Sequence, residues 1–245
     1  SNIEKLELFK SVKAAVGDSS DVIAGTTDNN TSESIKLSIE AQKLGVDGLL
    51  LTVPAYNKPT QEGLLAHFSK IADSIEIPGI LYNVPGRTSL NMDAETTIEL
   101  SKHENIIGIK EASSDISQIT KIITKTSGSD FKIWSGNDDE TFSILSIGGH
   151  GVVSVASNIV GLQISKMIDT FLDGKIESAS KQNKQLLPLF KELFWITNPI
   201  LVKRALNISG FNVGGLRLPM IDSNQYDTKF SELLSDYEID VAGIK

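Results

Sequence analysis

The chain has 245 residues, of which 40% are hydrophobic and none is cysteine, and these proportions predict a globular protein with one large domain or two small ones. Its 23 basic and 31 acidic residues give a net charge of −8, and the basic residues are scattered along the chain, which argues against nucleic acid as a partner. No apolar run approaches the roughly 20 residues that span a bilayer, and the first residues lack the pattern of a signal peptide, so we expect no membrane association and a cytoplasmic location.

The first segment of the chain is a predicted helix. Apolar residues recur at helical spacing from Ile3 to Val16. Ser1 and Glu4 have the spacing of a capping box, which satisfies backbone amides at the start of a helix. Gly17 follows the last apolar position, where glycine commonly ends a helix. We therefore expect the chain to open on a helix that ends just before Gly17.

Six short apolar runs follow, separated by amphipathic helical stretches, and we interpret them as strands. They cover residues 21–25, 48–53, 79–84, 106–110, 131–135 and 152–156, and the first intervening helix covers residues 32–44. The runs are continuous rather than alternating, as in parallel strands that helices bury on both faces. No glycine-rich phosphate loop follows the first run, so this alternation favours an α/β barrel of the TIM (β/α)8 type over a doubly wound sheet.

The strand count departs from that of a complete barrel, which has about eight strands. Two strands are missing from the N-terminal side, so we expect an incomplete barrel whose open edges are replaced, covered or supplied by another chain. After the last run the pattern is helical only, over residues 162–172, 176–195, 199–208 and 228–237. The expected organisation is a partial barrel over residues 1–160, followed by the last barrel helix and a C-terminal helical extension over residues 161–245.

Barrels of this kind place their catalytic groups at the carboxyl ends of strands, a rule that selects Tyr56, Tyr82, Arg87, Lys110 and Gly136. Lys110 closes the fourth run, where confinement would favour the neutral amine that attacks a ketone. The alternative is that Lys110 lies beyond the strand and pairs with its neighbour Glu111 in solvent.

Three further candidates lie in or near the third run and in the loop after the second run. Tyr82 lies in an otherwise apolar run, where a phenol can relay protons, although a buried tyrosine with a satisfied hydroxyl is equally common. Arg87 lies in the next loop, where a guanidinium can hold a carboxylate by two hydrogen bonds, although a surface arginine is the simpler interpretation. Tyr56 offers a second phenol in a loop bounded by Pro54 and Pro59, which can also be only a rigid exposed loop.

No metal site is expected from this sequence. His103 and His150 stand alone, and neither has a second histidine or a carboxylate at the spacing of a metal ligand. Asp138 and Asp139 are interpreted as caps of the following helix rather than as cation ligands.

Several segments together resemble dihydrodipicolinate synthase. They are residues 82–88 (YNVPGRT), 107–112 (IGIKEA), 198–203 (NPILVK) and 216–220 (LRLPM), joined by residues 54–63 and 148–155. The segments occur in unbroken order and at matching spacing from the first helix to near the C-terminus, which is more specific than any one of them. The resemblance implies a barrel lyase that forms a Schiff base with pyruvate.

The resemblance also implies a role for each candidate. Lys110 would be the Schiff-base lysine, and Tyr82 the phenol that relays protons. Tyr56 would reach into the site of a neighbouring subunit and complete the relay. Arg87 would bind the carboxylate of the incoming aldehyde.

The implied reaction joins pyruvate to L-aspartate 4-semialdehyde and gives 4-hydroxy-tetrahydrodipicolinate on the route to lysine. Gly136 and the backbone of Val153 would line the pyruvate pocket. The partners expected from the resemblance are pyruvate, a small carboxylate-bearing aldehyde and further copies of the chain in a homodimer or homotetramer. The reaction needs no cofactor.

One family motif has no counterpart in this chain. It is a Gly-Thr-Thr-Gly-Glu segment after the second strand, whose threonines join the phenol relay and whose amides receive the pyruvate carboxylate. Residues 25–28 (GTTD) look similar but align with a segment after the family's third strand. Two alternatives follow: a catalytically inactive paralogue that serves as a scaffold or binding partner, and a related 2-keto acid aldolase with a different aldehyde. Arg87 favours an aldehyde that carries a carboxylate.

Overall fold

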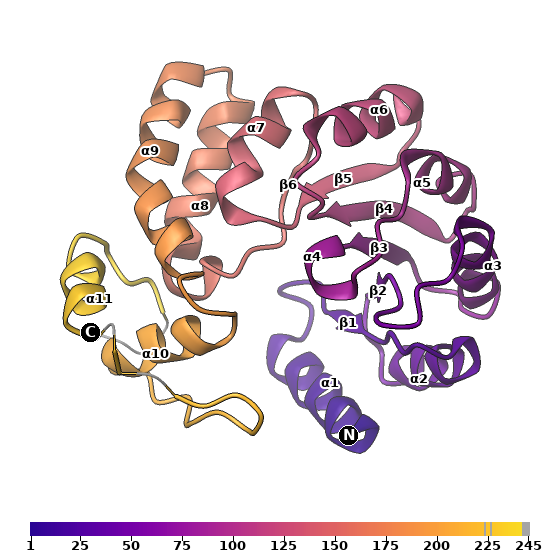
Figure 1. Ribbon diagram of the computed structural model, residues 1–245, viewed down its shortest axis with the longest axis horizontal. Coiled ribbons are helices and arrows are strands. Elements are labelled where there is room, and N and C mark those ends of the chain that lie inside the picture. The colour runs from indigo at the N-terminus through magenta and orange to yellow at the C-terminus, as the bar shows by residue number, and fades with distance from the viewer. Residues whose placement is uncertain (223, 226, 242–245) are drawn as a thin grey trace. The chain divides into compact units, whose positions relative to one another are not determined.

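The computed structural model describes residues 1–222, 224–225 and 227–241 (Figure 1). The chain forms two compact units: Ser1–Gly136 with Ile147–Val152 make unit 1, and Asn137–Ser146 with Val153–Lys245 make unit 2. The expected division into residues 1–160 and 161–245 stays a prediction.

Unit 1 contains an open sheet of six parallel strands, hydrogen-bonded in the order in which they occur in the sequence. The strands are β1 (Ile23–Gly25), β2 (Gly48–Thr52), β3 (Gly79–Asn83), β4 (Ile106–Glu111), β5 (Lys132–Ser135) and β6 (Gly151–Val152). All six predicted strands are therefore confirmed, as half of a barrel. The last is shorter than predicted, because β6 ends at Val152 and leaves residues 153–156 outside the sheet.

Helices join successive strands of unit 1, as the parallel order requires. They are α2 (Thr31–Lys43), α3 (Gln61–Ala72), the short α4 (Pro85–Thr88), α5 (Ala94–Leu100) and α6 (Ile116–Thr126), and α1 (Asn2–Val16) precedes β1. Figure 1 shows α2, α3, α5 and α6 along one face of the sheet. Leu49, Leu81 and Ile109 of the strands and Phe68 of α3 are no more than 1% exposed, so the core of this unit lies among the strands and these helices.

The first helix has the ends that the sequence predicts. The hydroxyl of Ser1 accepts a hydrogen bond from the backbone of Glu4 in a complete capping box, and Gly17 caps the other end with φ +58°. No residue of α1 is fully buried. Its tie to the sheet is polar: Lys13 Nζ lies 2.8 Å from Asp47 Oδ2, and the same carboxylate accepts a hydrogen bond from the backbone of Val22.

The open edge of the sheet is also as predicted. Among the described residues, β1 pairs only with β2, and β6 pairs only with β5. Ile23 at the β1 edge is 44% exposed. An unpaired parallel strand with an exposed apolar side chain is a surface on which other chains can add.

Unit 2 is helical in its described residues. Its elements are the 3-10 helix η1 (Asp138–Glu140), α7 (Thr141–Ser146), α8 (Ser157–Leu172), α9 (Ile176–Glu192), α10 (Ile200–Ile208) and α11 (Asp227–Leu234). The four helices predicted after residue 160 are thus confirmed. Two aromatic contacts contribute to the packing: Phe142 meets Phe171 edge to face at 5.4 Å, and the rings of Trp195 and Phe230 lie 6.4 Å apart.

The expected helix caps near the start of unit 2 were wrong. Asp138 and Asp139 lie inside η1, whose N-cap is Asn137 and has no side-chain capping bond. Asp138 is instead 3% exposed, and its Oδ2 accepts hydrogen bonds from the backbone amides of Val155 and Ala156. A carboxylate that binds two amides fixes the chain just after Val153.

Candidate active site

Two candidate residues meet at the carboxyl ends of neighbouring strands. The register pairs Tyr82 of β3 with Lys110 of β4. Side chains of directly paired residues lie on the same face of a sheet. The Lys110 amine accordingly stands over the Tyr82 ring, with Nζ 4.1 Å from the ring centroid. The structure therefore places an amine and a phenol within reach of one small molecule.

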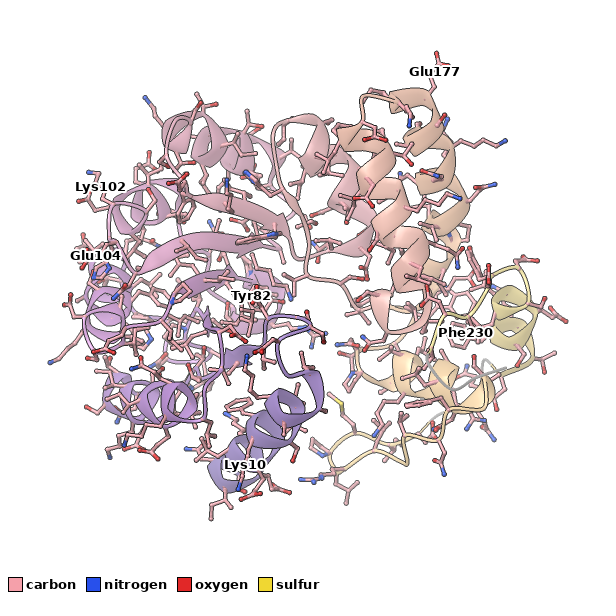
Figure 2. The ribbon with its side chains drawn as sticks, turned by 180° about the vertical axis from the view of Figure 1, so that it is seen from behind. Lys10, Tyr82, Lys102, Glu104, Glu177 and Phe230 are labelled. Carbon is pink, nitrogen blue, oxygen red and sulfur yellow. The ribbon has the colours of Figure 1, made fainter. Side chains whose placement is uncertain are left out.

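The Tyr82 side chain is half-buried. Figure 2 shows it among the strands of unit 1, whereas Lys10, Lys102 and Glu104 lie at the rim of this unit. Burial raises the pKa of the Tyr82 phenol above its ordinary value, and the positive charge of Arg87 opposes this shift. The phenol is thus a protonated donor at neutral pH.

Gly136 closes one side of this pair. Its amide donates a 2.7 Å hydrogen bond to the carbonyl of Glu111, which extends the pairing of β4 with β5 beyond Ser135. A Cβ atom on Gly136 would lie 2.7 Å from the Ala112 Cβ and 3.2 Å from the Lys110 Cε. Only glycine allows the backbone to pass this close to the lysine side chain.

The alternative in which Lys110 lies beyond the strand and pairs with Glu111 in solvent was wrong, because both residues belong to β4 and Glu111 is buried. The side chain is fully buried. Its carboxylate accepts hydrogen bonds from the Ser113 backbone at 2.9 Å, from Asn83 Nδ2 at 3.1 Å and from Gln118 Nε2 at 3.3 Å. Burial raises the pKa of the Glu111 carboxyl, and these hydrogen bonds oppose the shift.

Asn83 and Glu111 are the polar residues that sequence reasoning missed. Each directly follows a candidate, Tyr82 or Lys110, in a strand that reads as buried on both faces. That position was the available signal, because a buried amide or carboxylate needs partners that a neighbouring strand must supply.

Arg87 lies in α4, the single helical turn that follows β3. Pro85 starts this turn, and Ser89 ends it in the left-handed conformation with φ +59°. The Arg87 side chain is exposed, and its charge is close enough to affect the Tyr82 phenol. The structure therefore brings a guanidinium to the vicinity of the pair, as expected for a residue that meets an incoming anion.

Tyr56 is not brought into the pair by its own chain. Its side chain is 91% exposed, and its backbone has φ +71°, a conformation that costs energy for a residue with a Cβ. The Tyr56 amide donates to the Thr88 carbonyl at 3.4 Å, and the Ala55 amide donates to Asn29 Oδ1 at 2.9 Å. These bonds hold the loop in a strained shape that presents the phenol to solvent.

The threonines after β1 have structural partners. The Thr26 hydroxyl is buried and shares a 2.8 Å hydrogen bond with Ser38 of α2. Thr27 Oγ1 accepts a 2.6 Å hydrogen bond from the Thr52 backbone at the end of β2. These bonds join β1 to its neighbours and agree with the prediction that residues 25–28 are not the missing family motif.

Val153 lies in unit 2, one residue after β6, and is 37% exposed. Its expected place beside the pyruvate pocket stays a prediction. Within residues 1–222, 224–225 and 227–241, no cluster of three or more His, Asp or Glu residues has the geometry of a metal site. No described helix combines the length and the apolarity needed to cross a membrane.

Comparisons with known proteins identify the family of the chain. A family model described as the dihydrodipicolinate synthetase family matches residues 1–237. A protein of Dehalococcoides mccartyi named 4-hydroxy-tetrahydrodipicolinate synthase is 48% identical over 97% of this chain and 80% of its own length. A relative of the same name from Thermoanaerobacter pseudethanolicus is 50% identical over 88% of this chain and 73% of its own length.

Solved structures show the same similarity. The crystal structure of dihydrodipicolinate synthase from Aquifex aeolicus matches with a TM-score of 0.94 and 34% identity, over 99% of this chain and 83% of that one. The Thermotoga maritima enzyme of the same name matches with a TM-score of 0.91 and 40% identity, over 96% and 80% of the two chains. The chain thus corresponds to about four fifths of each structure.

The contact between Gly136 and Lys110 gives a first prediction. Gly136→Ala forces a Cβ against Ala112 and the Glu111 carbonyl, and overpacking of this kind costs about 1–3 kcal/mol of stability. Urea denaturation measures the cost. Gly86→Ala is the matched control, because a Cβ at Gly86 meets nothing within 4 Å. Equal unfolding midpoints for the two variants would show that the close approach at Gly136 has no energetic consequence.

Proposed function

Because the chain belongs to the dihydrodipicolinate synthetase family, we propose that it joins pyruvate to L-aspartate 4-semialdehyde through an imine on Lys110. The protein is a lyase of lysine biosynthesis, as its homologues are. The observation that supports the residue assignment is the position of the Lys110 amine, 4.1 Å from the centre of the Tyr82 ring at the carboxyl ends of adjacent strands.

The first step is attack of the neutral Lys110 amine on the ketone carbon of pyruvate. A C–N bond forms, and the ketone oxygen takes up a proton to give a carbinolamine. Loss of this hydroxyl as water, with a second proton, leaves the imine. Each stage transfers a proton to an oxygen next to the amine, and a phenol beside Lys110 can donate that proton.

Tyr82 is the proposed donor for these transfers. Its raised pKa keeps the phenol protonated at neutral pH, so it can hydrogen-bond to the oxygen that becomes the leaving water. The charge of Arg87 opposes this upward shift and thereby makes the phenol a better proton donor.

The imine nitrogen is protonated, and loss of a proton from the pyruvate methyl group then gives the enamine. The enamine carbon attacks the aldehyde carbon of the second substrate, and a C–C bond forms while the aldehyde oxygen is protonated. The amino group of the joined product displaces Lys110 from the imine carbon, which closes the ring and frees the lysine. Arg87 is assigned to the carboxylate of the aldehyde, because a guanidinium binds a carboxylate with two parallel hydrogen bonds.

Tyr56 is assigned to the site of a second copy of the chain. The Tyr56 backbone is strained and its phenol is exposed, so neither feature contributes to the packing of unit 1. We therefore infer a homodimer or a homotetramer in which each subunit contributes a tyrosine to its neighbour. The proposal places this enzyme in the cytoplasm, with no role for nucleic acid, no membrane association and no cofactor.

A second candidate function rests on one observation. The family motif that carries the relay threonines has no counterpart in this sequence. A paralogue that has lost the relay would keep the fold and act as a scaffold or binding partner. A related aldolase with another aldehyde is the third candidate. Pyruvate trapping and a comparison of aldehyde substrates separate the three candidate functions.

Pyruvate trapping tests the lyase assignment. We expect incubation with pyruvate and sodium borohydride to add one reduced pyruvyl group per chain, because borohydride reduces the imine to a stable secondary amine. Intact-mass spectrometry detects the adduct, and Lys110→Ala is expected to abolish it. A folded wild-type chain that gains no mass would favour the inactive paralogue.

The role of Arg87 predicts a selective defect. We expect Arg87→Met to lower kcat/KM for L-aspartate 4-semialdehyde by about 10- to 100-fold, the loss typical of hydrogen bonds to a charged group. Pyruvate trapping by the same variant should fall much less, because Arg87 affects imine formation only through the effect of its charge on the Tyr82 phenol. An aldehyde of equal length without the carboxylate is the matched control. An equal loss with both aldehydes would show that Arg87 does not bind the carboxylate.

The role of Tyr56 predicts complementation between subunits. Lys110→Ala and Tyr56→Phe should each have little activity, and mixed subunits should regain activity, because one subunit supplies the lysine and the other the tyrosine. Steady-state turnover after subunit exchange measures the gain. Lys110→Ala mixed with Tyr82→Phe is the control and should stay inactive, because Tyr82 and Lys110 act from the same chain. Absence of a gain in hybrid oligomers contradicts the assignment.

A further inference from the structure

A second pair of side chains lies directly beyond the amine and the phenol. The register pairs Asn83 with Glu111, the residues that follow Tyr82 and Lys110. Because side chains alternate along a strand, this second pair lies on the opposite face of the sheet from the first. Asn83 and Glu111 are both fully buried.

The buried pair is the centre of a hydrogen-bond network. Asn83 Nδ2 donates to both carboxylate oxygens of Glu111, at 3.1 and 3.3 Å, and to Asn91 Oδ1 at 2.8 Å. Asn83 Oδ1 accepts a 3.0 Å hydrogen bond from the Met92 backbone. Gln118 of α6 donates to Glu111 and also accepts a 2.8 Å hydrogen bond from Asn91. The network therefore joins β3, β4, the segment before α5, and α6.

The pairing of β3 with β4 contains an irregularity that makes such a network useful. Gly79 pairs with Ile106, but Ile80 pairs with Gly108, so Ile107 is skipped. Ile107 is also 37% exposed, as an extra residue in a bulged strand can be. The start of the ladder therefore does not fix the register at its carboxyl end.

In a register without the bulge, Lys110 and Tyr82 would lie on opposite faces of the sheet. If Ile80 paired with Ile107, Tyr82 would face Ile109, and Lys110 would pair with Asn83 on the other face of the sheet. A one-residue slip moves every following side chain to the opposite face. The apolar residues 106, 107 and 109 of β4 do not by themselves select one register, because an apolar side chain is present for either face. The amide of Asn83 and the carboxylate of Glu111 meet only in the bulged register.

A buried polar network of this kind contributes little to the free energy of unfolding. Removing a carboxylate from water carries a penalty that its hydrogen bonds only partly offset, and apolar replacements of similar volume are often neutral or stabilising. What the network supplies instead is geometric specificity, since each donor and acceptor is satisfied in one arrangement only.

We propose that the Asn83–Glu111 hydrogen bond is a register lock that holds Lys110 against Tyr82, which makes Asn83 and Glu111 positioning residues for imine formation. The proposal rests on the assignment of Lys110 as the Schiff-base lysine. Neither side chain touches substrate. Both act through the residue that precedes them in the strand.

The test uses exchange of donor and acceptor in the full chain. Glu111→Gln and Asn83→Asp each leave two groups of the same kind facing each other. The double variant again opposes an amide and a carboxylate, with the direction reversed. Thr97→Val is the control, because the Thr97 hydroxyl is equally buried in α5 and has no hydrogen-bond partner among the described residues.

Two readouts are compared at temperatures where circular dichroism shows each variant folded. The first is the rate of borohydride-trapped pyruvyl adduct on Lys110, measured against pyruvate concentration. The second is the rate at which acetic anhydride acetylates Lys110, followed by peptide mass spectrometry, which needs no pyruvate.

We expect Asn83→Asp to lower the maximal trapping rate about 10-fold or more, because it sets two carboxylates against each other and small displacements of a reacting group have effects of this size. Glu111→Gln should lower this rate less, because the substituted amide keeps one oxygen that can accept a hydrogen bond from Asn83. The half-saturating pyruvate concentration should change little, and Lys110 acetylation should change in parallel with trapping. The double variant should recover part of both rates, and Thr97→Val should match the wild type. Single variants that melt earlier but trap pyruvate and acetylate at wild-type rates would overturn the lock.

The acetylation readout separates this proposal from the proposed function. If wild-type protein traps no pyruvate, the lyase assignment fails, and acetylation of Lys110 in the four variants still decides whether the network positions it. If Glu111→Gln does not fold, Asn83→Leu replaces it, since that change removes both hydrogen bonds from Asn83 to the carboxylate. Unchanged Lys110 acetylation in Asn83→Leu likewise contradicts the lock.

Discussion

The pairing of β3 with β4 is the constraint on which the candidate site depends. These two strands carry Tyr82 and Lys110, and their register decides whether the amine and the phenol share a face. A parallel ladder has no tight turn to set its register, because its strands are joined by a long crossover connection. The register must therefore come from side chains, and the buried Asn83–Glu111 hydrogen bond is placed to provide it.

Close backbone contact carries the same constraint to the next strand. A side chain at Gly108 would lie 2.4 Å from the Lys132 carbonyl, and one at Gly136 would meet Ala112 and the Lys110 side chain. Both glycines let β5 approach β4 closely. Lys110 of β4 therefore lies between β3, which carries Tyr82, and β5, which is followed by Gly136. Chemistry at Lys110 is thus supported by residues that have no reactive group.

The open sheet has an edge to which another chain could bind. The chain corresponds to about 80% of the length of relatives such as the Dehalococcoides mccartyi protein, and β1 presents an unpaired edge among the described residues. Tyr56 of unit 1 is 91% exposed, which is compatible with the proposed contact with a second copy of the chain.

The sequence by itself determined the strands, the helices and the candidate residues, because apolar periodicity, caps and motif spacing are local properties of the chain. The capping box at Ser1 and the placement of Lys110 at a strand end are examples. Only the tertiary structure decided that Ile107 is skipped, that Glu111 is buried, and that β6 ends before Val153. These outcomes depend on which residues of distant segments face one another, and a run of similar apolar residues is compatible with more than one such pairing.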